Sequence, residues 1–217
     1  NLGLDEGVVL ASGNVHQIPN PASFFASNNY GQPGDPTLNT ITTSTTHDAS
    51  VLEFDFIPTA DTLRFRYVFG SEESPEWVGS SYNDVFGFFV TGPKPNGLGT
   101  YNNYNVALIP GTSLPVTINN VNAGSYSQYY VNNGNGTTIV YDGFTTVLTA
   151  LLVVVPCEQY HIKLAVGDAG DYAYDSGIFL EANSFSSSGP STNVSYSNSS
   201  VWFGAAVGAC NDAQLTF

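Results

Sequence analysis

Short runs in which apolar and polar residues alternate, separated by Gly, Pro and Asn, limit most strongly what this chain can fold into. The runs LEFDFI (residues 52–57) and LRFRYVF (residues 63–69) alternate cleanly, whereas helical periodicity is nearly absent. Alternation places successive side chains on opposite faces of a strand. Many short strands with turn-rich spacers predict an all-β protein, an antiparallel β-sandwich of jelly-roll-like form with long loops.

The same pattern predicts where the strands and the long loops lie. If the strands at 51–57 and 62–69 pair across the sequence IPTAD, acidic side chains of the first meet arginines of the second on an exposed face. The intervening segments 19–48, 91–105 and 119–135 are predicted as loops, and loops of this length usually carry function or are disordered. The expected strands are residues 7–10, 51–57, 62–69, 84–90, 106–109, 116–118, 144–155, 160–166 and 177–185.

Composition divides the chain and excludes several classes of partner. Residues 1–188 form the predicted sandwich, 189–200 a Ser/Asn-rich linker, and 201–217 the first strand or strands of a following module. With 4 Lys and Arg against 18 Asp and Glu, the net charge is −14, which argues against nucleic acid and anionic membranes as partners. No apolar window is long enough to insert into a membrane. The absence of Met and the scarcity of Lys fit an extracellular or cell-surface protein.

Acidic residues gather in two places without basic neighbours. Clustered carboxylates repel one another unless a cation sits among them, and Ca²⁺ takes 6–8 oxygen ligands. We therefore hypothesise a Ca²⁺ site, with the alternative that Asp and Gly here only form turns. Because Glu72 and Glu73 are adjacent, at most one of them is expected to face the aspartates on an extended segment. The candidate metal ligands are Asp168, Asp171, Asp175, Glu72, Glu73 and Asp84.

Aromatic residues crowd the loops, and Trp77, Tyr82, Tyr101 and Tyr104 are the candidate ligand-binding residues. Rings beside Asn and Asp suit a glycan or a peptide ligand, although the same rings could simply pack the loops onto the sandwich. No nucleophile elbow, phosphate loop or zinc spacing is present. A pair of carboxylates could serve a glycan-acting enzyme, but no catalytic pattern supports one, and no enzyme activity is expected.

Five long segments together resemble the choice-of-anchor L domain of bacterial secreted and surface proteins. They are residues 1–15, 47–73, 82–93, 105–122 and 141–185, and they cover most of the predicted sandwich in order. The resemblance implies an exported, non-enzymatic, adhesion-type module followed by Ig-like modules, of which residues 201–217 would be the start. It also implies that the domain begins earlier in relatives, so an N-terminal portion is expected to be missing here.

The cysteines depart from the pattern of the resemblance. Gly79 stands where many relatives are expected to carry a cysteine, the natural partner of Cys157. Cys157 and Cys210 are the disulfide candidates, either with each other or each with a cysteine outside this chain.

Together, these observations predict a calcium-stabilised module of a bacterial surface adhesin that binds carbohydrate or peptide through its loops. The alternative is a structural subunit of an extracellular filament or sheath, in which copies of the chain assemble by strand addition. A glycan-acting enzyme is the third possibility.

Overall fold

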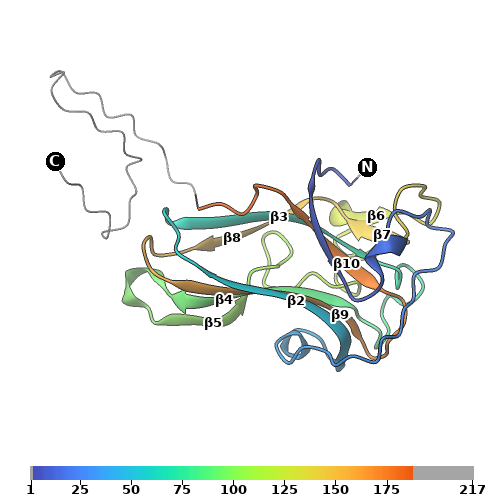
Figure 1. Ribbon diagram of the computed structural model, residues 1–217, viewed down its shortest axis with the longest axis horizontal. Coiled ribbons are helices and arrows are strands. Elements are labelled where there is room, and N and C mark those ends of the chain that lie inside the picture. Colours follow the sequence, from blue (N-terminus) through green and yellow to red (C-terminus); the bar gives the residue numbers. More distant parts are fainter. Residues whose placement is uncertain (1, 188–217) are drawn as a thin grey trace, which may run out of the picture.

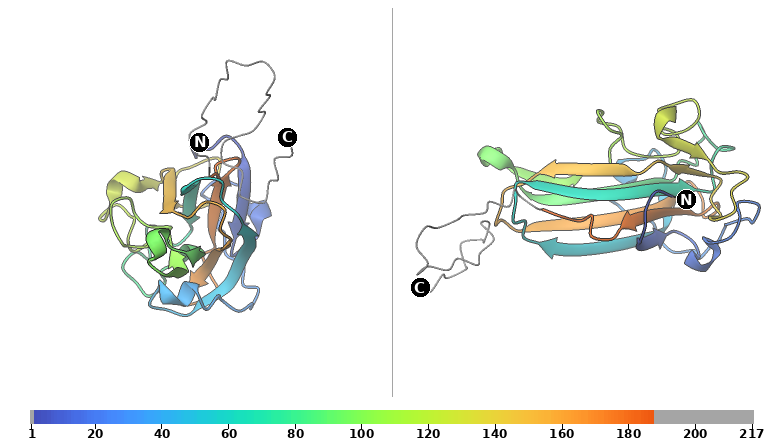
Figure 2. Two further views of the ribbon diagram at one scale, coloured as in Figure 1. Left: turned by 90° about the vertical axis from the view of Figure 1, so that its left-hand side faces the viewer. Right: turned by 90° about the horizontal axis from the view of Figure 1, so that it is seen from above.

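The computed structural model describes residues 2–187, which form two antiparallel β-sheets packed face to face (Figures 1 and 2). This confirms the predicted all-β sandwich. The only helices among the described residues are four short 3₁₀ turns: η1 (Val15–Gln17), η2 (Leu38–Thr40), η3 (Pro95–Gly97) and η4 (Ser127–Tyr129). Within that part of the chain, no helix is long and apolar enough to cross a membrane. The expected linker at 189–200 and the module start at 201–217 lie outside the described residues.

The first sheet has six strands, and every pairing in it is antiparallel. Its order is β1-β10-β3-β7-β6, and β8 pairs with the first half of β3 while β7 pairs with its end. The strands are β1 (Gly7–Ala11), β3 (Thr62–Ser71), β6 (Tyr130–Asn132), β7 (Gly143–Thr145), β8 (Leu148–Val153) and β10 (Ser176–Glu181).

The second sheet has four strands in the order β2-β9-β4-β5. They are β2 (Thr46–Phe56), β4 (Val85–Pro93), β5 (Thr100–Asn105) and β9 (Tyr160–Ala169). The outer face of this sheet is covered by η2, whose Leu38 packs with Val85, Phe89 and Ala165. Lys163 holds the η2 segment in place through an ion pair with Asp35 (Nζ–Oδ2, 2.5 Å).

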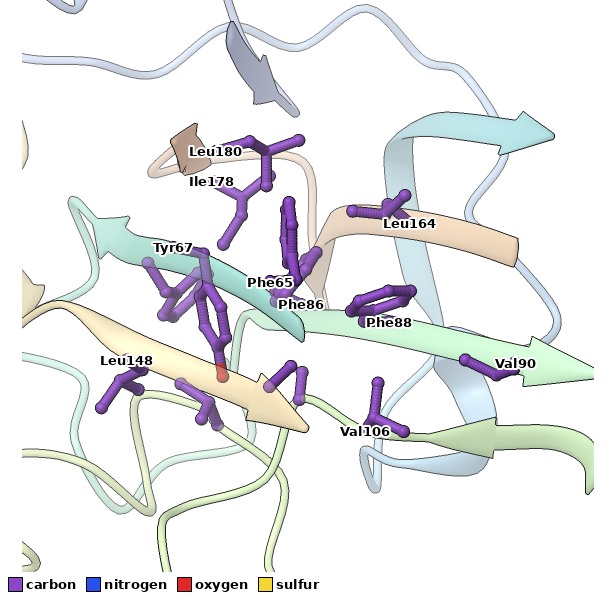
Figure 3. Close-up of a cluster of buried hydrophobic side chains, with 14 of the residues drawn as sticks. Phe65, Tyr67, Phe86, Phe88, Val90, Val106, Leu148, Leu164, Ile178 and Leu180 are labelled. Carbon is purple, nitrogen blue, oxygen red and sulfur yellow. The ribbon is translucent and has the colours of Figure 1, made fainter. Parts of the chain in front are cut away.

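Aromatic and aliphatic side chains from the inner faces of both sheets fill the space between them (Figure 3). Phe65 and Tyr67 of β3 meet Phe88 and Phe86 of β4, with ring centroids 5.2 and 5.3 Å apart respectively. Leu148 of β8 and Leu164 of β9 extend this core on either side. The inward-facing residues therefore continue the alternation that the sequence displays.

Three of the expected strands differ from those observed. Residues 106–109 and 116–118 make only isolated bridges, although Val106, Ile109, Val116 and Ile118 are buried in the core. Their apolar character reflects burial of a loop and not strand pairing. The expected strand at 144–155 is divided between β7 and β8. Conversely, the predicted loop at 91–105 contains β5, which sequence alternation could not reveal because its side chains are mostly exposed.

The expected pairing of the strands at 51–57 and 62–69 is wrong. These segments belong to β2 and β3, which lie in different sheets. β2 pairs instead with β9, where Glu53 lies 3.3 Å from Lys163 and Asp55 lies 2.9 Å from His161. Arg66 of β3 pairs with Glu181 of β10 (2.5 Å). The connection IPTAD thus crosses from one sheet to the other, as is common in sandwiches.

Two fully buried tyrosines allow a matched test of the core. The Tyr67 hydroxyl has no hydrogen-bond partner, whereas the Tyr160 hydroxyl donates to the Pro93 carbonyl (2.6 Å) and accepts from the Val155 N–H (2.7 Å). An unpaired buried polar group costs about 1–3 kcal/mol. We expect Tyr67→Phe to raise the free energy of unfolding by about 1 kcal/mol and Tyr160→Phe to lower it by about 1–2 kcal/mol. Urea denaturation measures both; equal losses in the two variants would contradict this account of the core.

Candidate functional site

At one end of the sandwich, the hydrophobic core gives way to inward-facing polar residues. Val85 of β4 pairs with Gly167 of β9, so Asp84 and Asp168, one position further along each strand, lie opposite each other. Directly opposed residues of antiparallel strands have Cβ atoms about 4.5–5.5 Å apart, and like charges there are destabilising. These polar positions, each two residues beyond a core residue of its strand, are Ser71, Asp84, Asp168 and Ser176.

Asp84 is tied to both sheets. It is 0% exposed, and its Oδ1 accepts a hydrogen bond from the Ala169 N–H (2.8 Å) in its own sheet. Its Oδ2 accepts one from the Ser176 hydroxyl (2.6 Å) of the opposite sheet. Ser176 in turn pairs with Ser71 at the end of β3. Asp84 therefore links the ends of β4, β9 and β10.

Asp168 and Glu73 are buried without any such partners. Their exposures are 0% and 1%, and none of their four carboxylate oxygens has a hydrogen-bond partner in the part of the chain that the structure describes. The nearby Ser12 hydroxyl does not serve Asp168, because it donates to the Ser176 carbonyl (3.2 Å). Glu73 is placed beside Asp84 by its backbone N–H, which donates to the Ser71 hydroxyl (3.1 Å). We call Glu73, Asp84 and Asp168 the acidic layer.

No Lys or Arg neutralises the acidic layer, and His47, which lies opposite Asp168 in the β2–β9 register, contacts the Tyr172 ring (centroids 4.0 Å apart). The four Lys and Arg residues all lie in the described part of the chain, and each is placed elsewhere. Arg66 pairs with Glu181, Lys163 pairs with Asp35 and Glu53, and Lys94 lies over the Tyr101 ring. Arg64 is exposed on β3. Charge on the layer must therefore be removed by protons or balanced by a cation from solution.

Burial raises the pKa of each carboxyl in the layer. For Glu73, burial and then the charge of Asp84 raise the pKa to about 9. Burial also raises the pKa of Asp84 and of Asp168, and the charge of Asp84 is the next cause for Asp168. Lack of solvation and mutual repulsion both disfavour the ionised forms.

A second group of acids lies beside the layer, nearer the surface. Burial, followed by the charges of Asp142, Asp175 and Glu76, raises the pKa of Glu72 to about 8, although its Oε1 accepts from the Ala26 N–H (3.3 Å). Its other oxygen is buried and unpaired. Glu72 and Glu73 thus each have an acidic neighbour in the β9–β10 loop, Asp175 and Asp171 respectively. The expectation that at most one of them would face these aspartates is not met, because β3 ends at Ser71 and the segment is not extended beyond it.

Asp175 fastens the N-terminal loop to this end of the sandwich. Its Oδ1 accepts from the Asn28 N–H (2.8 Å), and its own N–H donates to the Ala26 carbonyl (3.0 Å). Gly13 makes the close approach possible, because a Cβ at that position would lie 1.7 Å from Asp175 Oδ2. Tyr174 adds a further bond from its N–H to the Ser27 hydroxyl (3.1 Å). The loop containing residues 26–28 is thereby held against the β9–β10 loop.

The six candidate metal ligands therefore divide into three groups. Glu73, Asp84 and Asp168 form the layer, and Glu72 and Asp175 lie beside it. Asp171 is only half-buried, and its Oδ1 accepts from the Ala173 N–H (3.0 Å), a turn-forming role. The layer supplies hard oxygen donors of the type that Ca²⁺ prefers. Within residues 2–187, however, no group of three or more His, Cys, Asp or Glu side chains is arranged to hold a metal ion as it stands.

Four aromatic rings form a continuous strip over the same end of the molecule. Phe25 contacts Tyr174 edge-to-face (centroids 5.1 Å apart), Tyr174 contacts Trp77 (6.0 Å), and Trp77 contacts Tyr82 edge-to-face (5.3 Å). Phe25 and Trp77 are exposed, and the other two rings are half-buried. We call Phe25, Tyr174, Trp77 and Tyr82 the aromatic strip. All four rings are close in sequence or by hydrogen bond to the buried acids. Phe25 precedes Ala26, which binds Glu72; Tyr174 precedes Asp175; and Tyr82 precedes Asp84 by two residues. The Trp77 N–H donates to the Glu73 carbonyl (3.0 Å).

The structure separates the four candidate ligand-binding residues into two pairs. Trp77 and Tyr82 belong to the strip, but Tyr101 and Tyr104 lie on β5, where their rings contact each other (5.4 Å). Figure 1 shows β5 at the end of the sandwich opposite the N-terminal loops. Sequence reasoning missed Phe25 and Tyr174 as strip members; Tyr174, directly before Asp175, offered a signal through its place in the acidic loop. Cys157 is disulfide-bonded, and Cys210 lies outside the described residues.

The raised pKa values predict an unusual dependence of stability on pH in the absence of divalent cations. Acids whose pKa is raised on folding stabilise the protein below their unfolded pKa of about 4, and this contribution is lost as pH rises through the folded values, about 8 for Glu72 and about 9 for Glu73. In EDTA, we expect the Tm to be higher at pH 5.5 than at pH 8.5, by about 5 °C or more. Differential scanning calorimetry measures it, and a Tm that rises with pH across this range would contradict the prediction.

Of three comparisons with known proteins, one gives a match, to a family model. The family model of the choice-of-anchor L domain matches residues 1–186. No curated protein matches the chain, and no solved structure matches it. Domains of this family are surface-associated modules of bacteria, at the cell surface or secreted. Because the match spans nearly all of the sequence, the chain belongs to the choice-of-anchor L domain family.

Proposed function

We propose that the protein is a non-enzymatic adhesion module that binds carbohydrate through the aromatic strip. The observation that carries the proposal is the strip itself, in which rings from three separate loops form one exposed surface. Phe25 is 56% exposed and Trp77 is 37% exposed. Exposed, contiguous aromatic surface on a soluble domain is typical of an interaction site.

The chemistry of the strip suits a sugar. Aromatic faces stack on the C–H faces of pyranose rings, and they do so without a deep pocket. The strip lines neither the hollow beside β1 nor the small one around Ser71 and Tyr130. Nearby carboxylates and amides, including those of Asp171 and Asn119, provide acceptors and donors for hydroxyl groups. An aromatic surface that lines no pocket and has a polar border favours an extended glycan over an apolar peptide side chain, which needs a concave pocket.

The loops that carry the strip are fixed before any ligand arrives. The Gly79 N–H donates to Asn119 Oδ1 (2.5 Å), the Tyr82 N–H donates to the Ser80 hydroxyl (3.0 Å), and Asp175 holds the loop of Phe25. Preorganisation lowers the entropic cost of binding. Loops on a rigid scaffold are where binding residues usually lie.

Two single substitutions test whether the ligand binds the aromatic strip or the Tyr101–Tyr104 pair on β5. We expect Trp77→Ala to weaken glycan binding about tenfold or more, about 1.4 kcal/mol, because it removes the central ring of the strip. Tyr104→Ala, an equally exposed aromatic on β5, serves as the control and should leave the affinity unchanged. A glycan array identifies the ligand, and titration calorimetry with that glycan compares the variants.

The results decide between distinct readings of the strip. Equal losses in both variants, or binding that survives Trp77→Ala, would remove the strip from the site. Absence of any glycan hit, together with capture of a peptide, would assign the strip to protein ligands instead.

The edge strand β1 favours a second candidate, assembly of copies by strand addition. Among residues 2–187, β1 pairs only with β10, so its other edge is open to any segment beyond them or to another chain, and Val8 is 60% exposed. Beside it lies a hollow of about 240 Å³ lined mainly by apolar residues, among them Leu2, Leu4 and Phe179. An open edge next to apolar surface can accept a strand from a neighbouring copy.

A single charged substitution tests assembly through β1. Val8→Lys places a charge on the edge, a device by which natural sheets prevent pairing. If the chain assembles through β1, sedimentation velocity should show polymers for the wild type and monomers for the variant. A wild-type monomer at all concentrations measured would exclude this candidate and leave carbohydrate binding unaffected.

A further inference from the structure

The acidic layer is an unusual arrangement because three buried carboxyl groups meet without a protein counter-ion. Asp84 and Asp168 oppose each other across β4 and β9, and Glu73 approaches from the end of β3. Both oxygens of Asp168 and of Glu73 are buried and unpaired. Buried polar groups are almost always satisfied, so four orphaned oxygens in one place indicate a partner that the protein chain does not supply.

We propose that Glu73, Asp84 and Asp168 bind one Ca²⁺ ion that joins the two sheets at this end of the sandwich. Asp84 and Asp168 belong to the sheet of β4 and β9, whereas Glu73 follows β3 of the other sheet. An ion between them would connect the sheets through its ligands. The site is independent of the aromatic strip, so it does not rest on the proposed carbohydrate binding.

The donor set fits a large, hard cation with tolerant geometry. Three carboxylates provide up to six oxygens, and the Ser176 hydroxyl, 2.6 Å from Asp84 Oδ2, can add one more. Ca²⁺ accepts six to eight oxygen ligands in irregular arrangements, whereas Mg²⁺ requires a tight octahedron and retains its waters. The two positive charges of Ca²⁺ also offset most of the repulsion among the three carboxylates.

Ligand closure requires a modest side-chain movement. As the side chains stand, no three acidic groups surround a common point within the described residues. Glu73 and Asp168 have no hydrogen bonds that a rotation would break. Asp84 is already oriented by Ala169 and Ser176 and gives the fixed part of the site. The movement is therefore confined to two unrestrained carboxyl groups.

Of the six acidic residues predicted as metal ligands from the sequence, this proposal retains three. Asp171 bonds to its own turn, and Asp175 Oδ1 is engaged by Asn28 while Oδ2 lies against Gly13. Glu72 has Asp142 and Asp175 as its nearest charges. These residues hold the loops around the ion without ligating it.

The experiment compares thermal unfolding in Ca²⁺ and in EDTA for the wild type, Asp168→Asn, Glu73→Gln and the control Asp55→Asn. Asp55 is an exposed acid near the end of β2, opposite His161 of β9, so the control removes the same charge outside the site. At calcium concentrations about 100-fold above the Kd, the wild type and control should gain about 5–10 °C. Both layer variants should lose this gain.

A second feature of the same data separates a ligand role from a structural one. In EDTA, Asp168→Asn and Glu73→Gln should unfold at a higher temperature than the wild type, because each replaces a buried, repelled carboxylate by a neutral group of the same shape. A purely structural residue would lower the Tm in both buffers. Mg²⁺ should reproduce only a small part of the calcium effect.

Terbium luminescence gives a readout that does not depend on variant stability. Tb³⁺ occupies calcium sites, and buried Tyr141, whose hydroxyl lies against Gly177 beside the Ser176 that bonds Asp84, is the ring placed to sensitise it. We expect emission from the wild type that Ca²⁺ displaces at one equivalent per chain. No calcium shift and no displaceable emission would overturn the proposal and leave the layer as a set of neutral acids. Glycan binding lost in Trp77→Ala alone would be unaffected by that failure.

Discussion

The constraint on which this structure depends is the meeting of Asp84, Asp168 and Glu73 at the point where the hydrophobic core ends. Each is fully buried, and no Lys or Arg reaches them. A sandwich normally closes its ends with apolar side chains or lets loops and water in. Here the inward-facing positions of four strands change from Phe, Val and Ile to Asp and Ser within one step of the alternation. The hydrophobic core and the acidic layer are therefore consecutive parts of the same strands.

That arrangement determines how the loops above it are held. Carboxylate and backbone groups of Asp175 and Glu72 receive or donate the bonds that fix residues 26–28. The loop of Trp77 begins at Glu73, and Tyr82 precedes Asp84 by two residues. The aromatic strip is consequently anchored on the same segments that carry the acids. Any agent that neutralises the layer, whether protons or a cation, acts directly on the segments that present the rings.

The fold class and most strands were predictable because alternation survives wherever one face of a strand is buried. It failed where this condition does not hold: β5 is exposed on both faces, and the core residues Val106 and Ile109 come from a loop. The pairing partner of β2 could not be read from adjacency, since its acids meet Lys163 and His161 of β9, more than a hundred residues away. The candidate acids were recognisable from their types and from the lack of bases. Their division into three inward-facing residues and three supporting ones depends on register, which only the three-dimensional pairing supplies.

Burying carboxyl groups where two sheets meet is costly, and this cost makes the stability of that end sensitive to pH and to cations. A purely apolar end would be more stable but insensitive to its surroundings. Three carboxyl groups without a counter-ion leave the end of the sandwich dependent on what the solution provides. For a surface-associated module, the external medium differs from the cell interior in both calcium and pH, and the acidic layer is the part of the chain that can register that difference. Under the proposed calcium assignment, the end of the sandwich that presents the aromatic rings would be rigid only where the ion is bound, and loop order would depend on the medium outside the cell.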